Sequence, residues 1–222
     1  MSRLLKNLVR KSTFVTNVVA FLYNMLFSNC RLQIILGNIS AKGVFLKGTR
    51  FVIRGNHNRI SLGKGSSLNC CTIFVQGNGC NFVLGGGKIS NTVIYIEDDK
   101  SNIVIGNGFT MGSGHVASTE GKTITIGNDC MFSNDIEIRN GDSHSIYDKE
   151  CNRINNAKDV SIGNHVWLTA HVRILKGSLI PDGCVIANSC ILTSNLQTPN
   201  AIYGSMPVKL LKSNITWKRP RT

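Results

Sequence analysis

The sequence predicts an all-β fold, a solenoid in which short flat strands follow one another with corners at regular intervals. Two patterns predict it: aliphatic residues recur every six positions near the C-terminus, and one strand motif recurs before them. From residue 160 to 197 the sixth positions hold Ile162, Leu168, Ile174, Ile180, Ile186 and Leu192, and four residues after each stand Val166, Val172, Ser178, Cys184, Cys190 and Leu196. Neither a helix nor an alternating strand has this period. A coil of short strands does, because its aliphatic side chains stack as ladders inside a narrow prism.

The strand motif consists of Asn or Lys, alternating aliphatic residues and a final glycine. Its five copies end at Gly63, Gly85, Gly106, Gly127 and Gly163. The first four copies are 21 or 22 residues apart, which predicts longer coils at the N-terminal end. We expect each of these glycines at a sharp corner, where a positive φ costs least.

With its hexapeptide repeat the chain resembles the left-handed β-helix acyltransferases. The resemblance implies three flat faces, about 18 residues per coil and a homotrimer. We expect three parts: a helical segment at residues 1–30, a left-handed parallel β-helix at 31–198 with an excursion loop at 140–159, and a basic C-terminal tail at 199–222.

The N-terminal segment differs in kind from the rest. Basic residues at positions 3, 6, 10 and 11 precede an apolar stretch from Phe14 to Phe27. This stretch is shorter than the ~20 residues that a membrane span needs, and no small-residue cleavage site follows it. It predicts one or two amphipathic helices with two open roles: capping the coil stack or a trimer partner, or lying on the inner membrane surface. We expect a cytoplasmic protein.

The net charge of +13 is unevenly distributed. No Asp or Glu precedes Glu97, whereas twelve Lys and Arg do. Between residues 97 and 208 eight basic residues face twelve acidic ones, and the tail adds five more basic residues. This asymmetry predicts attraction to polyanions, such as an anionic glycan, or to an anionic membrane. Solubility alone is the other interpretation, and we expect no nucleic-acid partner.

The eight cysteines do not predict a disulfide scaffold. Cys130, Cys184 and Cys190 occupy the inward small-residue position of the repeat, and no Cys-x-x-Cys pair of the metal-binding type is present. Cys70 and Cys71 are adjacent, so on a strand they face opposite ways. Reduced thiols are expected.

His144 is the candidate catalytic residue. The aliphatic ladder ends after Ile138, and the polar, turn-rich stretch that follows predicts a loop that leaves the prism. An imidazole at its start can take a proton from an attacking hydroxyl and return it to a leaving thiolate.

Three segments around this histidine resemble bacterial capsule and O-antigen polysaccharide O-acetyltransferases, including those that act on polysialic acid. They are Asp-Ser-His-Ser-Ile-Tyr-Asp at 142–148, Arg-Ile-Asn-Asn-Ala-Lys-Asp-Val at 153–160 and Ile-Gly-Asn-His-Val-Trp at 162–167. The resemblance implies transfer of an acetyl group from acetyl-CoA to a hydroxyl of a surface polysaccharide or its sugar precursor. His144 would be the general base and Trp167 would line the reaction site.

The resemblance also implies contacts with coenzyme A. Ala170 would lie near the pantetheine arm, although Thr169 replaces the usual glycine, and Asn188 lies one coil later. Further candidates are Thr193, Ser194, Lys209 and Lys212. Ser194 stands where the family often has a lysine for coenzyme A, and the two lysines would meet the phosphates as point charges. A solvated basic tail is the other interpretation of these lysines.

Two other function classes are compatible with parts of the sequence. The same fold hosts carbonic anhydrases that hold zinc with three histidines, and this chain has five, at positions 57, 115, 144, 165 and 171. His165 and His171 are six residues apart, at equivalent places on successive faces, but the tighter Gly-His-x4-His-Gly pattern is missing, so no metal is expected. A scaffold that only binds polyanions is disfavoured by the intact histidine loop.

Overall fold

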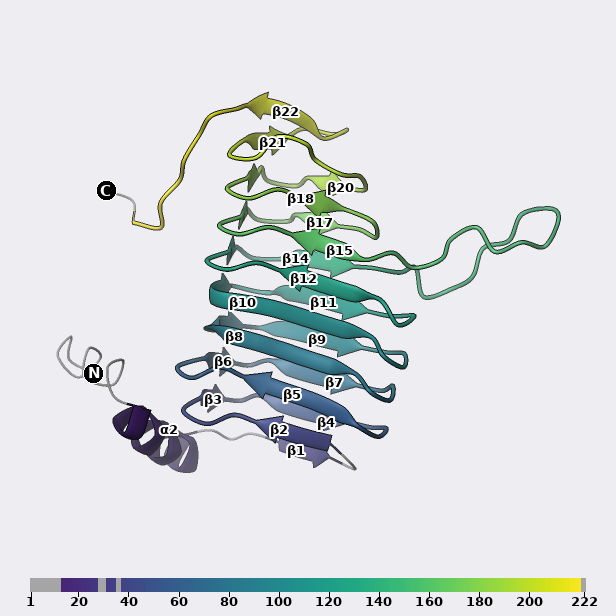
Figure 1. Ribbon diagram of the computed structural model, residues 1–222. Helices are drawn as coiled ribbons and strands as arrows, with labels where there is room; N and C mark the ends of the chain where they lie inside the picture. Colours follow the sequence, from purple (N-terminus) through teal and green to yellow (C-terminus); the bar gives the residue numbers. More distant parts are fainter. Residues whose placement is uncertain (1–12, 28–30, 35–36, 221–222) are drawn as a thin grey trace.

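The computed structural model describes residues 13–27, 31–34 and 37–220. They form a parallel β-solenoid with one helix beside its N-terminal end, and the predicted all-β fold is confirmed (Figure 1). The basic residues at positions 3, 6, 10, 11 and 221 and Cys30 lie outside the described residues.

The strands stack on three faces of the prism. Face A is an eight-stranded parallel sheet. In order along the solenoid it contains β1 (Arg31–Ile34), β4 (Arg50–Ile53), β7 (Thr72–Val75), β9 (Thr92–Ile96), β11 (Gly114–Ser118), β14 (Ile136–Arg139), β17 (Arg173–Ile174) and β20 (Ile191–Leu192).

Faces B and C are joined into one sheet by two long strands, β8 (Asn81–Ser90) and β10 (Asn102–Met111), which turn a corner and contribute to both. Face B also holds β2 (Gly37–Ser40), β5 (Asn58–Leu62), β12 (Thr123–Ile126), β15 (Val160–Ile162) and β18 (Leu179–Ile180). Face C holds β3 (Phe45–Lys47), β6 (Ser67–Asn69), β13 (Met131–Phe132), β16 (Trp167–Leu168), β19 (Val185–Ile186) and β21 (Ile202–Gly204), on which β22 (Lys209–Lys212) pairs antiparallel.

The core consists of the predicted aliphatic ladders. Ile162 pairs with Ile180, 18 residues on, and both are buried. In the earlier coils Phe82 pairs with Ile103 and Ile103 with Ile124, which is the expected 21-residue spacing. Each coil therefore buries its aliphatic side chains directly on those of the next one, and their burial drives the stacking.

The corner glycines serve a different purpose from the one predicted. The glycines that end the strand motif do not have a positive φ, so that expectation is wrong. A Cβ on Gly63 would lie 1.5 Å from the carbonyl oxygen of Gly85, and one on Gly127 would lie 2.6 Å from the carbonyl carbon of Gly163. Glycine is needed because successive corners stack too closely for any side chain. The positive φ falls two residues later, at Asp129 and His165 for example.

The burial of the cysteine thiols agrees with their positions in the repeat. Cys130, Cys184 and Cys190 are buried inside the prism, and burial raises the pKa of the Cys130 thiol to about 11. Cys71 is buried and Cys70 exposed, but both lie at the corner between β6 and β7 and not on a strand, and Cys70 has a positive φ of 53°. All cysteines within the described residues are free.

An excursion loop leaves the solenoid between β14 and β15 (Figure 1). Ile124 of β12 nevertheless pairs directly with Val160 of β15. The loop is therefore an insertion at one corner between faces A and B, and the coils above and below it remain in register.

The helix α2 (Thr13–Phe27) contacts the first coil. Thr16 and Ala20 are buried, and the side-chain amide of Asn24 donates to the carbonyl of Val44 and accepts from the amide of Leu46. The outward side of α2 exposes apolar side chains at Val18, Phe21 and Leu22. No helix in the described ranges has the length and apolar character needed to cross a membrane.

Candidate active site

The base of the excursion loop is fixed by a buried asparagine. Asn140 follows β14 directly, and its side chain accepts a hydrogen bond from the amide of Thr119 and donates one to the hydroxyl of Ser118. The next residue, Gly141, passes so close to the preceding coil that a Cβ would lie 2.3 Å from the Thr119 methyl group. The chain therefore leaves the prism at one defined point.

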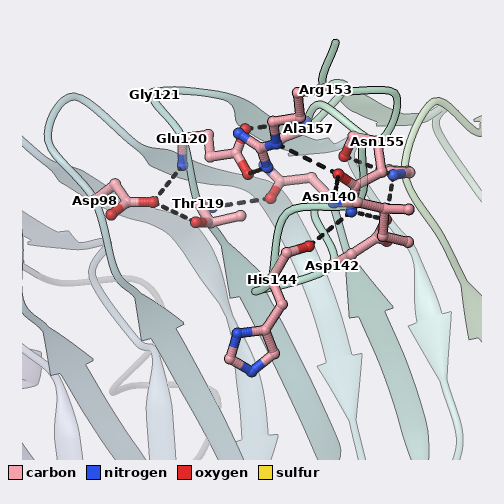
Figure 2. Close-up of polar contacts among 12 residues, drawn as sticks. Asp98, Thr119, Glu120, Gly121, Asn140, Asp142, His144, Arg153, Asn155 and Ala157 are labelled. Atoms are coloured by element: carbon pink, nitrogen blue, oxygen red, sulfur yellow. Dashed lines mark hydrogen bonds and ion pairs between the residues drawn. The ribbon is translucent and has the colours of Figure 1, made fainter. Parts of the chain in front are cut away.

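His144 lies four residues beyond Asn140 and is exposed. Its amide donates to the carbonyl of Asp142 at 2.8 Å, and its own carbonyl accepts from the side-chain amide of Asn155 at 2.7 Å. Figure 2 shows the imidazole pointing away from this polar cluster. Among the described residues none forms a hydrogen bond with the ring. The backbone is thus held while the imidazole stays available to a substrate.

Two ion pairs attach the loop to the solenoid. Arg153 pairs with Glu120, which lies at the corner before β12, and Lys176, at the corner after β17, pairs with Asp142. The hydrogen bond from Arg153 lowers the pKa of the Glu120 carboxyl, and the one from Lys176 lowers the pKa of Asp142. Both carboxylates are therefore ionised at neutral pH and hold the loop from the coils below and above it.

Trp167 begins β16 on face C and is half-buried. Its indole lies 5.8 Å from that of Trp217 in the C-terminal tail. The tail is anchored here, because Trp217 stacks on His165 and Arg219 pairs with Asp129. Burial acts to raise the pKa of Asp129, but hydrogen bonds from His165 and Arg219 outweigh it and lower that pKa.

The residues expected near the pantetheine arm lie at corners between faces C and A. Ala170 is half-buried and Asn188 is exposed. The two corners stack, since the amide of Ser189 donates to the carbonyl of Ala170 at 3.1 Å.

The remaining expected coenzyme contacts lie elsewhere. Thr193 and Ser194 are exposed at the corner between faces A and B, the edge from which the excursion loop also leaves. Lys209 and Lys212 are exposed at the two ends of β22. Within one chain the expected site residues therefore lie at different edges and faces of the prism. His144 and Trp167 are not brought together at one place.

The histidines do not converge either. His165 pairs with Asp129 and His171 with Asp135, each at its own corner. Within the described residues no group of three His, Cys, Asp or Glu side chains could hold a metal ion.

Sequence reasoning missed two features of this site. Asn155 was part of the resemblance but had no assigned role, although it contacts the His144 carbonyl. The sequence predicts only positive charge for Arg219 in the tail, whereas its guanidinium donates to the carbonyls of Gly108 and Cys130 and pairs with Asp129. Local signals could not reveal the tail contacts, because the partners are about 90 or more residues away. Asn155 is only 11 residues from His144, but Asn156 beside it has the same side chain, and the sequence does not show which of the two is buried.

Comparison with known proteins places the chain in a family. It is 34% identical over 183 residues to a polysialic acid O-acetyltransferase of Neisseria meningitidis, covering 82% of this chain and 85% of that protein. A polysialic acid O-acetyltransferase of Escherichia coli O1:K1 / APEC is 34% identical over 133 residues, which is 60% of this chain and 42% of the relative. No family model matches the chain.

Solved structures that resemble this chain agree with the sequence comparison. The polysialic acid O-acetyltransferase OatWY superposes with a TM-score of 0.81 at 34% identity, over 87% of this chain and 92% of its own. The polysialic acid specific acetyltransferase NeuO gives a TM-score of 0.59 at 25% identity, over 86% and 87%. The predicted left-handed parallel β-helix is confirmed. The chain therefore belongs to the hexapeptide-repeat O-acetyltransferases, in the family of the polysialic acid O-acetyltransferases.

Proposed function

We propose that this enzyme transfers an acetyl group from acetyl-CoA to a hydroxyl of an anionic bacterial surface polysaccharide, with His144 as the general base. Polysialic acid is the first acceptor to test, because two relatives carry that substrate in their names. The observation that carries the proposal is the exposed His144 imidazole on a loop whose backbone is fixed by hydrogen bonds.

The chemistry requires one group of the protein to take up a proton and then return it. A ring nitrogen of His144 takes the proton of the acceptor hydroxyl as its oxygen bonds to the thioester carbonyl carbon. The carbon–sulfur bond then breaks, and the imidazolium returns the proton to the thiolate. The products are an O-acetyl ester and coenzyme A, and the histidine ends neutral.

The co-substrate would be held mainly by the C-terminal coils. Trp167 offers an aromatic surface, and the small Ala170 leaves its corner backbone accessible to a pantetheine arm. Asn188, Thr193 and Ser194 are exposed polar groups on the neighbouring corners. The two β22 lysines present positive charge for phosphates.

A neighbouring subunit would complete the site. His144 and Trp167 lie on different sides of one prism, so a single active site needs the loop of one chain beside the β16 face of another. A cyclic trimer supplies this arrangement three times. We expect a trimeric mass by light scattering at micromolar concentration.

The N-terminal helix supports a proposal for where in the cell the enzyme acts. The apolar side chains that α2 exposes follow a basic stretch of sequence. This is the composition of a segment that lies in the interface of an anionic membrane. We propose a cytoplasmic enzyme that lies at the inner membrane surface, with capping of the coil stack as the other role of the helix.

The proposal is tested with purified protein, acetyl-CoA, polysialic acid and a neutral capsular glycan. Release of coenzyme A and formation of the O-acetyl ester are measured together. We expect His144→Ala to lower the turnover about 10²–10⁴-fold. The matched control is His57→Asn, an exposed histidine on the same prism edge whose positive φ asparagine tolerates. Full activity of His144→Ala would reject the mechanism.

A further inference from the structure

We propose that Asn155 is a positioning residue that fixes the backbone directly after the Cα of His144 and thereby aims its imidazole. This inference rests on the proposed role of His144 as the general base. It assigns a second residue of the excursion loop to the reaction, one that does not touch the substrate.

The side chain of Asn155 uses its full hydrogen-bonding capacity. Its amide nitrogen donates to the carbonyl of His144 at 2.7 Å and to Oδ2 of Asp142 at 3.0 Å. Its Oδ1 accepts from the amide of Ile146 at 2.8 Å and from Nε of Arg153 at 3.4 Å. An asparagine side chain has two donor hydrogens and two acceptor lone pairs, and all four are satisfied. Asn155 is 6% exposed in a loop whose other side chains mostly face solvent.

Two of these contacts hold the backbone directly after the histidine. The carbonyl of His144 and the amide of Ile146 lie on either side of Ser145, so one buried side chain ties two points of the short stretch that follows the histidine Cα. The ring itself has no hydrogen bond to any described residue. The direction of the imidazole therefore depends on the backbone that carries it, and this backbone depends on Asn155.

The hydrogen bonds of the Asn155 side chain form a clamp on the loop, and this clamp is in turn fixed to the solenoid (Figure 2). The backbone carbonyl of Asn155 accepts from Nζ of Lys176 at 2.9 Å, and the same lysine pairs with Asp142. On the other side Glu120 pairs with Arg153 and accepts from the amide of Ala157 at 3.2 Å. Asn155 thus transmits the position of two rigid coils to a loop that leaves the prism.

Such precision matters for proton transfer. Catalytic groups must be held within about 0.5 Å of the productive geometry, and a misplacement of about 1 Å can cost ~10²-fold in rate. An exposed loop without a clamp would sample many backbone conformations, and few of them would aim the ring at the acceptor hydroxyl.

The chain provides a matched control at the next position. Asn156 has the same side chain but is exposed. We expect Asn155→Ala to lower kcat about 10- to 100-fold, while Asn156→Ala keeps the parent rate. The KM for acetyl-CoA should stay unchanged in both, because the clamp does not belong to the coenzyme surface. The midpoint of the pH–rate profile should not move, because the same histidine remains the base. Only the fraction of time that its ring spends in the right geometry falls.

A second variant separates the two halves of the clamp. Asn155→Asp keeps the acceptor for Ile146 but loses the donors, and it places a carboxylate beside Asp142. We expect a loss of kcat at neutral pH close to that of Asn155→Ala. Circular dichroism and the trimeric mass establish that each variant is folded, and the coil register does not depend on the loop.

A double-variant cycle decides between positioning and a structural role. If Asn155 acts through His144, Asn155→Ala has no further effect on the residual turnover of His144→Ala. An equal loss in both backgrounds, or an Asn155→Ala enzyme as fast as Asn156→Ala, overturns the inference. A fully active His144→Ala enzyme instead rejects the proposed function, so the two failures are distinguishable.

Discussion

The indole of Trp217 lies parallel to the imidazole of His165, with 3.9 Å between the ring centroids and 8° between the planes. The indole nitrogen also donates to the carbonyl of His165 at 2.9 Å. The two residues are 52 positions apart, so this contact fixes the C-terminal tail to the corner that precedes β16. The tail therefore supports the face that carries Trp167.

We expect Trp217→Ala to release the tail. The residue is 7% exposed, and replacing a buried aromatic residue with alanine typically costs about 3–5 kcal/mol. Trp167 would then be the one remaining tryptophan, since the sequence has two. Its fluorescence should shift to the red as the Trp217 ring no longer covers it. The neighbouring Lys218→Ala, at an exposed position, serves as the control and should change neither the melting temperature nor the spectrum.

Close stacking of the corners predicts a large effect of Gly127→Ala. The added methyl group would meet only backbone, with the carbonyl carbon of Gly163 at 2.6 Å and the amide of Asn164 at 2.7 Å. Rigid neighbours of this kind make overpacking cost about 1–3 kcal/mol or more. Gly65→Asn is the contrast, because Gly65 has a positive φ but open space around it. Thermal denaturation of both variants measures the difference, and an equal melting temperature would contradict the stacking argument.

The ion pairs of the excursion loop predict an acid-sensitive contribution to stability. Hydrogen bonds from Arg153 and Lys176 lower the pKa values of Glu120 and Asp142 in the folded state. Their contribution is complete above the unfolded-state values of about 4 and is lost as the pH falls through the lowered folded-state values. The melting temperature of a Glu120→Gln, Asp142→Asn variant should lie below that of the parent at neutral pH. This gap should stay constant down to about pH 4 and shrink as the pH falls further, and a gap that keeps its full size well below about pH 4 would contradict the assignment.

The charge asymmetry predicts a salt-dependent acceptor affinity. Exposed charges are screened within ~8 Å at physiological ionic strength. The KM for polysialic acid should therefore rise steeply with NaCl, whereas the KM for acetyl-CoA should respond less. Initial rates at several salt concentrations measure both. A neutral glycan that is preferred at every salt concentration would assign the basic half to membrane attachment instead.

The two sides of α2 predict separable effects. Phe21→Asp with Leu22→Asp alters exposed positions, so binding to anionic vesicles should fall while the melting temperature stays the same. Asn24→Ala should lower the stability by about 0.5–1.5 kcal/mol per lost hydrogen bond, because its side chain bonds to Val44 and Leu46 of the first coil. Vesicle sedimentation and thermal denaturation measure the two effects. Unchanged vesicle binding of the double variant would leave capping as the role of the helix.

Much of the fold could be predicted from the sequence because each coil of a solenoid is built from the same short residue pattern, which is visible along the chain. The six-residue period places Ile162 and Ile180 on one ladder, and the end of the ladder after Ile138 marks the excursion loop. The histidine loop is also recognisable from the sequence, because its residues are close together along the chain.

The sequence by itself determined the coil, its length per turn, the loop and the histidine on that loop. Only the tertiary structure decided which of two adjacent asparagines holds His144, because Asn155 and Asn156 differ in burial and not in chemistry. It also decided that Gly127 is needed for close approach to Gly163, and that Trp217 lies on His165. These outcomes depend on which residues meet in space, within the loop or between coils, and a pattern along one chain does not contain that information.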